Sequence, residues 1–215
     1  MLQIEEAVHC LQQQVQPIRK TQSLPLLSAT GRILAQEGRA MMDQPPFPRS
    51  PLDGYAVRGQ DTAKAKKEAP VCLQVVGKVC AGEVFPGQVK AGEAVRIMTG
   101  APIPQGADTV IRQEDSDSGQ EQVMIYKSSK PYENYCYQGE DYKKGTLLLP
   151  KGTRLRGNEI ALAASLGLDP VMVYQKPQIA VVSTGDELTM PGEDLKPGKI
   201  NDSNRYWLSA RLSEL

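Results

Sequence analysis

The sequence lacks an excess of charge of either sign. Its 215 residues carry 25 Lys and Arg against 25 Asp and Glu, so the net charge is zero. A nucleic-acid-binding domain typically shows a basic surplus, so the sequence predicts no nucleic-acid partner. No apolar run approaches the roughly 18 residues needed to cross a bilayer. The first ten residues, MLQIEEAVHC, carry acids where a secretion signal needs bases. We therefore expect a cytoplasmic protein with no membrane segment.

Metal-binding cysteine and histidine are also scarce. The four cysteines lie far apart with no CxxC pair, and His9 is the only histidine. A zinc site made of Cys and His is therefore not expected. We expect Cys10, Cys72, Cys80 and Cys136 to be reduced thiols, as is usual in a reducing compartment.

What the sequence does contain is a β-rich middle region between helical segments. Apolar residues at positions 4, 8, 11, 15 and 18 predict one stripe of a helix, used for packing or as a dimer seam. From 24 to 173, short apolar runs are interrupted by Gly or Pro about every ten residues, which is typical of two small sheet lobes. A further helix is expected over 158–168, capped by Asn158. The predicted fold class is therefore α+β and β-rich.

The pattern changes at Pro177. IAVVS (179–183) is a continuous, mostly β-branched run, which predicts a strand buried on both faces. A turn follows, and then Leu208, Leu212 and Leu215 lie on one helical face. This is the start of a parallel βα unit. Because one strand and one helix cannot bury a doubly wound sheet, we expect the chain to be a fragment that ends inside a further domain.

Four turns place acidic or hydroxyl side chains beside glycine at the edge of an apolar run. They are SPLDGYAV (50–57), RIMTGAPIPQGADTVI (96–111), GEDYKKG (139–145) and VVSTGDEL (181–188). Each is also what an ordinary turn contains, because Gly accepts positive φ and Asp bonds its own backbone. Together they predict a site for a hard cation and an oxyanion or phosphorylated substrate, since Mg²⁺ binds carboxylates and phosphate oxygens together.

A proline-dense segment leads into the first of these turns. Pro45, Pro46, Pro48 and Pro51 precede Asp53. Proline fixes φ and donates no backbone hydrogen bond. We therefore expect a stiff link that restricts the position of the Asp53 carboxylate.

These motifs, together with ASLGL (164–168), follow one another in the order and spacing of the molybdopterin molybdenumtransferase (MoeA) family, which the chain resembles and to which the gephyrin E domain also belongs. The resemblance covers essentially the whole chain. It implies an elongated homodimer of four-domain subunits, in which the protruding lobe of one subunit faces the α/β domain of the other across the active site. It divides this chain into an N-terminal helix that belongs with the α/β domain (1–20), a discontinuous β-rich lobe (21–45 and 145–176), a protruding β lobe (46–144) and the truncated start of a molybdopterin-binding α/β domain (177–215).

The resemblance also implies a reaction. Family members insert molybdate into adenylylated molybdopterin, release AMP and depend on Mg²⁺, and the molybdopterin adenylyltransferase is a candidate partner. Carried over by motif, Asp53 and Asp141 are expected to be catalytic and to position the metal or the molybdate. Thr99 is expected to hydrogen-bond an oxyanion, and Glu187 to orient the substrate. The expected substrate-binding residues are Ser183, Thr184, Gly185 and Asp186.

The sequence departs from the family pattern just before the GED motif. The family commonly has Asn-x-Arg-x-x-Gly-Glu-Asp, whereas this chain reads NYCYQGED, with Cys136 at the arginine position. An arginine there would help to hold an oxyanion in a bidentate fashion, so its absence puts substrate affinity or metal preference in doubt. A gephyrin-like scaffold stays open as an alternative, and motif order disfavours an unrelated Mg²⁺-dependent phosphohydrolase. The sequence leaves both molybdate and tungstate open as the oxyanion.

Overall fold

A computed structural model describes residues 3–214, and these form two compact units. One, the inserted unit, runs from Arg39 to Leu147. The other, the flanking unit, combines the chain up to Gly38 with the chain from Leu148 onward. The division of the chain into four domain parts stays a prediction. Among the residues described, no helix has the length and apolar character needed to span a bilayer.

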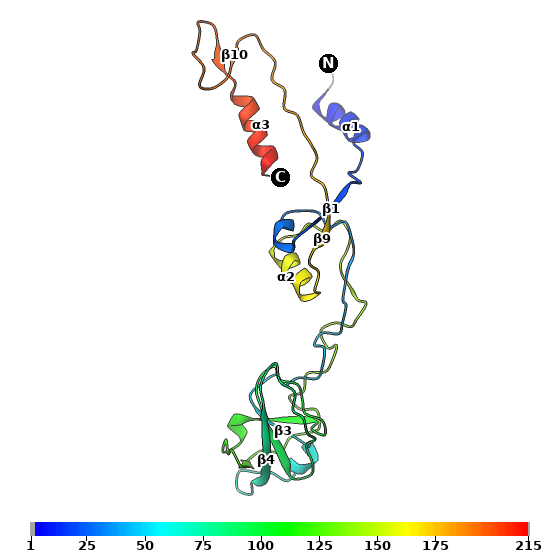
Figure 1. The fold of residues 1–215 in the computed structure, drawn as a ribbon, viewed down its shortest axis with the longest axis vertical. Helices are drawn as coiled ribbons and strands as arrows, with labels where there is room; N and C mark the ends of the chain where they lie inside the picture. Colours follow the sequence, from blue (N-terminus) through cyan, green and yellow to red (C-terminus); the bar gives the residue numbers. More distant parts are fainter. Residues whose placement is uncertain (1–2, 215) are drawn as a thin grey trace. The chain divides into compact units, whose positions relative to one another are not determined.

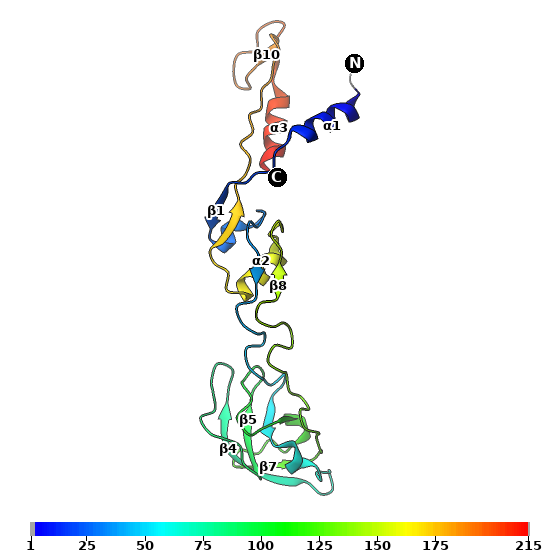
Figure 2. The same cartoon turned by 90° about the vertical axis from the view of Figure 1, so that its right-hand side faces the viewer.

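The inserted unit is built around a five-stranded sheet with the order β6-β3-β5-β4-β7. β3 pairs antiparallel with β5 and β6, whereas β4 is parallel to β5 and antiparallel to β7. Figure 1 labels β3 and β4 in this sheet, and Figure 2 shows β4, β5 and β7 after a quarter turn. The elements are β3 (Gly54–Val57), η2 (Gly59–Thr62), β4 (Val71–Val79), β5 (Glu93–Ile97), β6 (Thr109–Arg112), η3 (Gln113–Asp115) and β7 (Gln122–Ile125).

Both faces of this sheet are covered by apolar side chains. Successive residues of a strand point to opposite faces, so β3 supplies Tyr55 and Val57 to one core cluster and Ala56 to the other. Complete burial of a side chain such as Ile97 contributes about 1.5–3 kcal/mol. The sheet therefore gives a rigid base to the residues at its strand ends, where Asp53 and Thr99 lie.

The flanking unit joins segments that are far apart in the sequence. β1 (Thr21–Leu24) pairs antiparallel with β9 (Val171–Tyr174), as Figure 1 shows. η1 (Leu26–Ala29) and α2 (Gly157–Ser165) pack nearby. β2 (Gly38–Arg39) pairs with β8 (Leu147–Leu149), where the chain passes between the two units. The predicted α+β, β-rich class is confirmed.

The ends of α2 differ from the prediction. Its N-cap is Arg156 rather than Asn158, and the helix ends at Ser165. The backbone N–H of Arg156 donates to Oε2 of Glu159 at 2.9 Å. An acid at this spacing satisfies a free N–H at the helix start, which moves the cap two residues earlier than expected.

The N-terminal helix α1 (Ile4–Gln14) is shorter than the predicted stripe, which continues to position 18. Pro17 disfavours helical geometry in the residue before it, so Ile18 lies outside the helix. No α1 residue is buried, and Leu11 is 67% exposed. Its apolar stripe is therefore uncovered in residues 3–214.

The strand predicted for residues 179–183 is wrong. This segment has no strand pairing within the described chain, and Val182 is 80% exposed. A strand buried on both faces needs neighbours on both sides, and none of the described strands lies beside it. The unit continues with β10 (Leu188–Thr189), which pairs parallel with β11 (Ile200–Asn201), and with α3 (Ser203–Ser213). Of the expected apolar helical face, Leu208 is 42% exposed, Leu212 is half-buried and Leu215 lies outside the described residues.

Candidate functional site

Asp53 and Thr99, two of the expected catalytic residues, meet directly in the inserted unit. Asp53 immediately precedes β3, and Thr99 lies in the turn after β5. Both the backbone N–H and the hydroxyl of Thr99 donate to Oδ1 of Asp53, each at 2.7 Å. Because β3 and β5 are paired neighbours, the sheet fixes this contact. Both hydrogen bonds go to one oxygen, so Oδ2 of Asp53 stays available to a ligand at the exposed edge.

These hydrogen bonds favour the ionised form of Asp53. The side-chain and backbone hydrogen bonds from Thr99 lower the pKa of Asp53 below its ordinary value of 3.8, and the nearby Arg96 guanidinium lowers it further. Hydrogen bonds to a carboxylate favour its charged form. Asp53 therefore presents a fixed negative charge at neutral pH, as a cation ligand requires.

Gly54 holds Asp53 close to the neighbouring strand. A Cβ atom at position 54 would lie 1.9 Å from the backbone oxygen of Ile111 on β6. Gly54 has no positive φ, so the Asp-Gly pair is not needed here for a left-handed turn. Glycine is required because two backbones approach closely.

The proline-dense segment before Asp53 contacts the other two motifs of this unit through backbone hydrogen bonds. The Pro48 carbonyl accepts from the Ile103 N–H at 2.9 Å, in the loop that follows Thr99. The Pro45 carbonyl accepts from the Gly139 N–H in the GED turn, and the preceding Gln44 carbonyl accepts from the Asp141 N–H, each at 2.9 Å. The segment is thus held between the MTGAP and GED turns. Because proline has no backbone N–H, Pro45 and Pro48 can take part in such bonds only as acceptors.

Asp141 lies on the GED turn but is not joined to Asp53 by any contact in the described chain. The sequence analysis missed Asp43, which orders this turn. Its carboxylate accepts from the Lys144 N–H at 2.8 Å and from the Gln138 side chain at 3.1 Å. In the sequence, Asp43 is simply an acid just before the proline-dense segment, and this is not a recognised motif for ordering a turn.

The carboxylates suit a hard cation in charge and atom type. Within residues 3–214, no group of three or more Asp, Glu, His or Cys side chains gathers in metal-binding geometry. Mg²⁺ commonly binds through one or two carboxylates and completes its shell with water and substrate oxygens. Asp53 and Asp141 fit that mode as separate ligands, rather than as parts of a cage made by the protein alone.

The chain at Cys136 is paired with Arg49. Their backbone N–H and C=O groups exchange two hydrogen bonds of 3.1 Å each. Directly opposed residues of an antiparallel pair lie on the same face. Arg49 therefore places a cation beside the position where the family commonly has arginine. Around Cys136, the rings of Tyr132, Tyr135 and Tyr137 pack with centroids 5.1–5.8 Å apart.

A second group of expected residues lies in the flanking unit, around the N-terminus of α3. Ser183, Thr184 and Glu187 line a cavity of about 320 Å³, together with residues 201–205. The expected Gly185 and Asp186 lie on the adjoining exposed turn and do not line the cavity. The Lys199 ammonium donates to the Asp186 carbonyl, so the backbone of this turn is tied down.

Asp202 is the main residue in this cavity that the sequence analysis missed. It is 5% exposed, it caps α3 by accepting from the Arg205 N–H at 3.1 Å, and it accepts from the Ser183 hydroxyl. The Ser183 hydrogen bond, followed by the Arg205 N–H, lowers the pKa of Asp202 below 3.8. The signal was present, because Asp before a helical stretch is a common N-cap.

Comparison with known proteins identifies the family. Residues 2–167 match the family described as "MoeA N-terminal region (domain I and II)". The chain belongs to the MoeA family. It is 40% identical over 194 residues to the molybdopterin molybdenumtransferase of a Nostoc species, covering 90% of this chain and 44% of that protein. The Haemophilus influenzae molybdopterin molybdenumtransferase is 37% identical, covering 100% of this chain and 52% of that protein.

Solved structures of the same family share the fold. A molybdopterin biosynthesis MoeA protein from Pyrococcus horikoshii superposes with a TM-score of 0.90 at 37% identity, covering 98% of this chain and 56% of that one. A second structure of a molybdopterin biosynthesis MoeA protein from the same organism gives a TM-score of 0.85 at 39% identity, covering 100% of this chain and 55% of that one. The chain spans about half the length of the curated relatives that it matches.

Proposed function

We propose that this chain contributes to a molybdopterin molybdenumtransferase, which inserts molybdate into adenylylated molybdopterin and releases AMP in an Mg²⁺-dependent reaction. Molybdenum cofactor biosynthesis is the process to which its family belongs. The observation that carries the proposal within the chain is the Asp53–Thr99 pair, because it presents an ionised carboxylate and a neighbouring hydroxyl at a rigid sheet edge.

In this proposal the two groups of residues have different tasks. Asp53 and Asp141 would hold Mg²⁺, which supplies charge neutralisation for phosphate and molybdate oxygens when bound. Thr99 favours the ionised form of Asp53 and fixes its orientation. Ser183, Thr184 and Glu187 would bind and orient the pterin substrate, and the buried Asp202 holds the Ser183 hydroxyl in place.

Several parts of the proposal concern the assembled protein. The exposed apolar side chains of α1 support a helix that packs on another chain or domain, consistent with a homodimer. The homodimer, the adenylyltransferase partner and the cytoplasmic location stay predictions. Arg49 beside Cys136 offers a cation that substitutes in part for the family arginine.

The deciding experiment is Asp53→Asn in the protein that carries this chain with the rest of its family domains. We expect molybdenum insertion to fall by at least about a hundredfold, because loss of one preorganised electrostatic contact at a site costs about 10²–10³ in rate. Thermal stability should fall only slightly, because Asp53 is exposed and the Asn carboxamide oxygen can still accept the Thr99 hydrogen bonds. Insertion is measured as molybdenum content of the product, together with AMP release.

Glu68→Gln is the matched control, since Glu68 is an exposed acid of the same unit. It should insert molybdenum as the unmodified protein does. An Asp53→Asn protein that folds and inserts molybdenum at the normal rate would remove Asp53 from the site and leave the proposal without its main support.

A further inference from the structure

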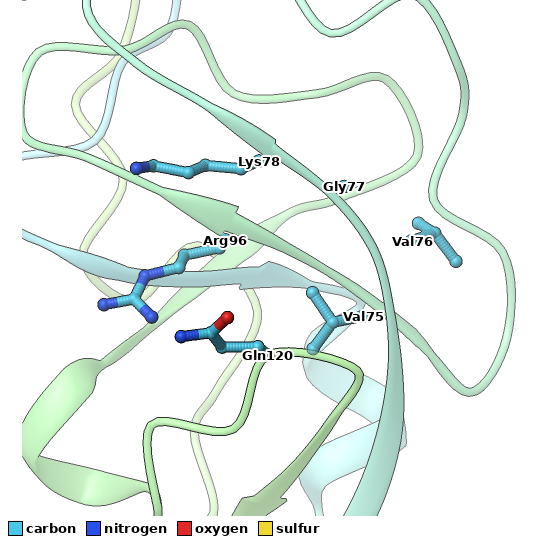
Figure 3. Close-up of a pocket in the computed structure, with 6 residues that line it drawn as sticks. All are labelled: Val75, Val76, Gly77, Lys78, Arg96 and Gln120. Carbon is cyan, nitrogen blue, oxygen red and sulfur yellow. The ribbon is translucent and has the colours of Figure 1, made fainter.

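A pocket on the sheet of the inserted unit is lined by two cations and has no place in the proposed reaction. Its volume is about 460 Å³, and it is lined by Val75, Val76, Gly77, Lys78, Arg96 and Gln120. Figure 3 shows the Lys78 and Arg96 side chains extending in the same direction from neighbouring strands, with the Gln120 carboxamide beside Arg96. Nitrogen donors of three kinds thus line one pocket.

A β-bulge puts Lys78 on this face of the sheet. The β4–β5 register runs Val75 to Ala94 and then Gly77 to Val95, so Val76 is an extra residue. A bulge of this kind reverses the alternation of side chains beyond it. Without it, Lys78 would point to the other face. With it, Lys78 is the direct cross-strand neighbour of Arg96.

Gly77, which follows the extra residue of the bulge, has no room for a side chain. A Cβ atom at position 77 would lie 2.6 Å from Cε2 of Phe85, which covers the opposite face of the sheet. The bulge therefore places a second cation in the pocket, while Gly77 leaves room for Phe85 on the opposite face.

Neither cation forms a direct ion pair within the described chain, although the Asp53 carboxylate lies near enough to Arg96 for their charges to interact. Among the described residues, no carboxylate lies within ion-pair distance of Lys78 or Arg96. Arg96 donates one hydrogen bond to Oε1 of Gln113 at 3.3 Å, which leaves most of its five N–H donors free. Like charges directly opposed across two strands are destabilising. An anion bound between them would relieve that repulsion.

We propose that Lys78, Arg96 and Gln120 form a binding site for a dianionic tetrahedral oxyanion group, carried by a phosphate monoester or by a free inorganic ion. Lys78 supplies a point charge, Arg96 supplies a planar fork of donors, and Gln120 adds a neutral donor. The half-buried Val75 offers an apolar wall for the organic part of an ester. The proposed function assigns no role to this site, although Arg96 also lies near Asp53.

Titration of the ¹⁵N-labelled 215-residue chain with phenyl phosphate, inorganic phosphate and molybdate tests the proposal. We expect amide shifts at residues 75–78, 96 and 120, and affinity that falls as salt is raised. Saturation by phenyl phosphate alone identifies an ester as the natural source, and equal affinity for the inorganic ions identifies a free ion. No shift at these positions with any of the three probes overturns the proposal.

Lys78→Gln should weaken binding by about tenfold, the effect of losing one charge-assisted hydrogen bond. Lys67→Gln is the matched control, because Lys67 is an exposed lysine outside the pocket and should bind as the unmodified chain does. Lys78→Glu should abolish binding without lowering the Tm, since the new carboxylate can pair with Arg96; this separates loss of the site from loss of the fold. Binding by Lys78→Gln or Lys78→Glu with unchanged affinity would overturn the proposal.

Discussion

The position after Asp53 has no room for a side chain. Gly54→Ala would put a methyl group 1.9 Å from a backbone oxygen of β6, and neither strand can move without breaking the register. Overpacking in a buried strand typically costs about 1–3 kcal/mol, and a clash with backbone is harder to relieve than one with a side chain. We expect a loss of about 2–4 kcal/mol in the free energy of unfolding, measured by chemical denaturation.

Gly157→Ala is the matched control for that substitution. Gly157 is the first residue of α2, with no atom within 4 Å of an added Cβ and no positive φ. Replacing a helical glycine by alanine should be neutral or stabilising by up to about 1 kcal/mol. Equal stability of the two variants would show that β3 and β6 can separate more easily than their register suggests.

The sequence was enough to predict Asp53 and Thr99 as site residues, but it did not explain why glycine follows Asp53. The resemblance placed both residues at one site, and the structure joins them by two hydrogen bonds. The Asp-Gly pair looked like a turn signal, whereas Gly54 is required by a close approach between strands. Such an approach depends on Ile111, a residue far along the chain, and no local pattern records it.

At the scale of elements, the least accurate predictions were the ends of the helices and the strand expected at residues 179–183. The cap of α2 depends on Glu159 reaching back to the Arg156 N–H, which competes with the better capping residue Asn158. The run 179–183 has the composition of a buried strand, but a strand forms only where another strand lies beside it. Composition therefore shows that a segment is able to form a strand, but a neighbouring strand is needed for the strand to form.

The N-terminus of α3 gives a prediction that depends on pH. The pKa of Asp202 is lower in the folded chain than its ordinary value of 3.8. Its contribution to stability is therefore fully present above pH 3.8 and is lost as the pH falls through the lowered pKa. Asp202→Asn should lower the Tm at about pH 7 and about pH 5 by similar amounts, and this difference should shrink as the pH falls below 3.8.

Thermal unfolding followed by circular dichroism provides the measurement. Asp202→Ala should be less stable than Asp202→Asn at neutral pH, because Asn can still cap the helix and Ala cannot. Asp194→Asn removes an exposed acid of the same unit and should match the unmodified chain. A Tm difference for Asp202→Asn that stays constant down to about pH 2 would show that the carboxylate charge does not stabilise the fold.

At the scale of the whole molecule, the inserted unit has the features of an independently folding domain. It contains both core clusters of the five-stranded sheet, and its two ends lie next to each other where β2 pairs with β8. We expect residues 39–147 expressed alone to give a dispersed amide NMR spectrum and one cooperative unfolding transition. Residues 148–215 alone lack β1, the partner of β9, and should show neither property. Collapse of residues 39–147 to an undispersed spectrum would mean that the flanking unit is needed for its folding.

The pairing of β1 with β9 has a consequence for synthesis on the ribosome. The carbonyl of Thr21 accepts from the Gln175 side chain, 154 positions later in the sequence. At typical translation rates, a nascent chain needs on the order of ten seconds to add that many residues. During this time β1 lacks its partner strand, while the whole of the inserted unit is made and can fold. A strand made before the whole of the inserted unit is thus among the last to pair, and until β9 is made it can pair only with a wrong strand.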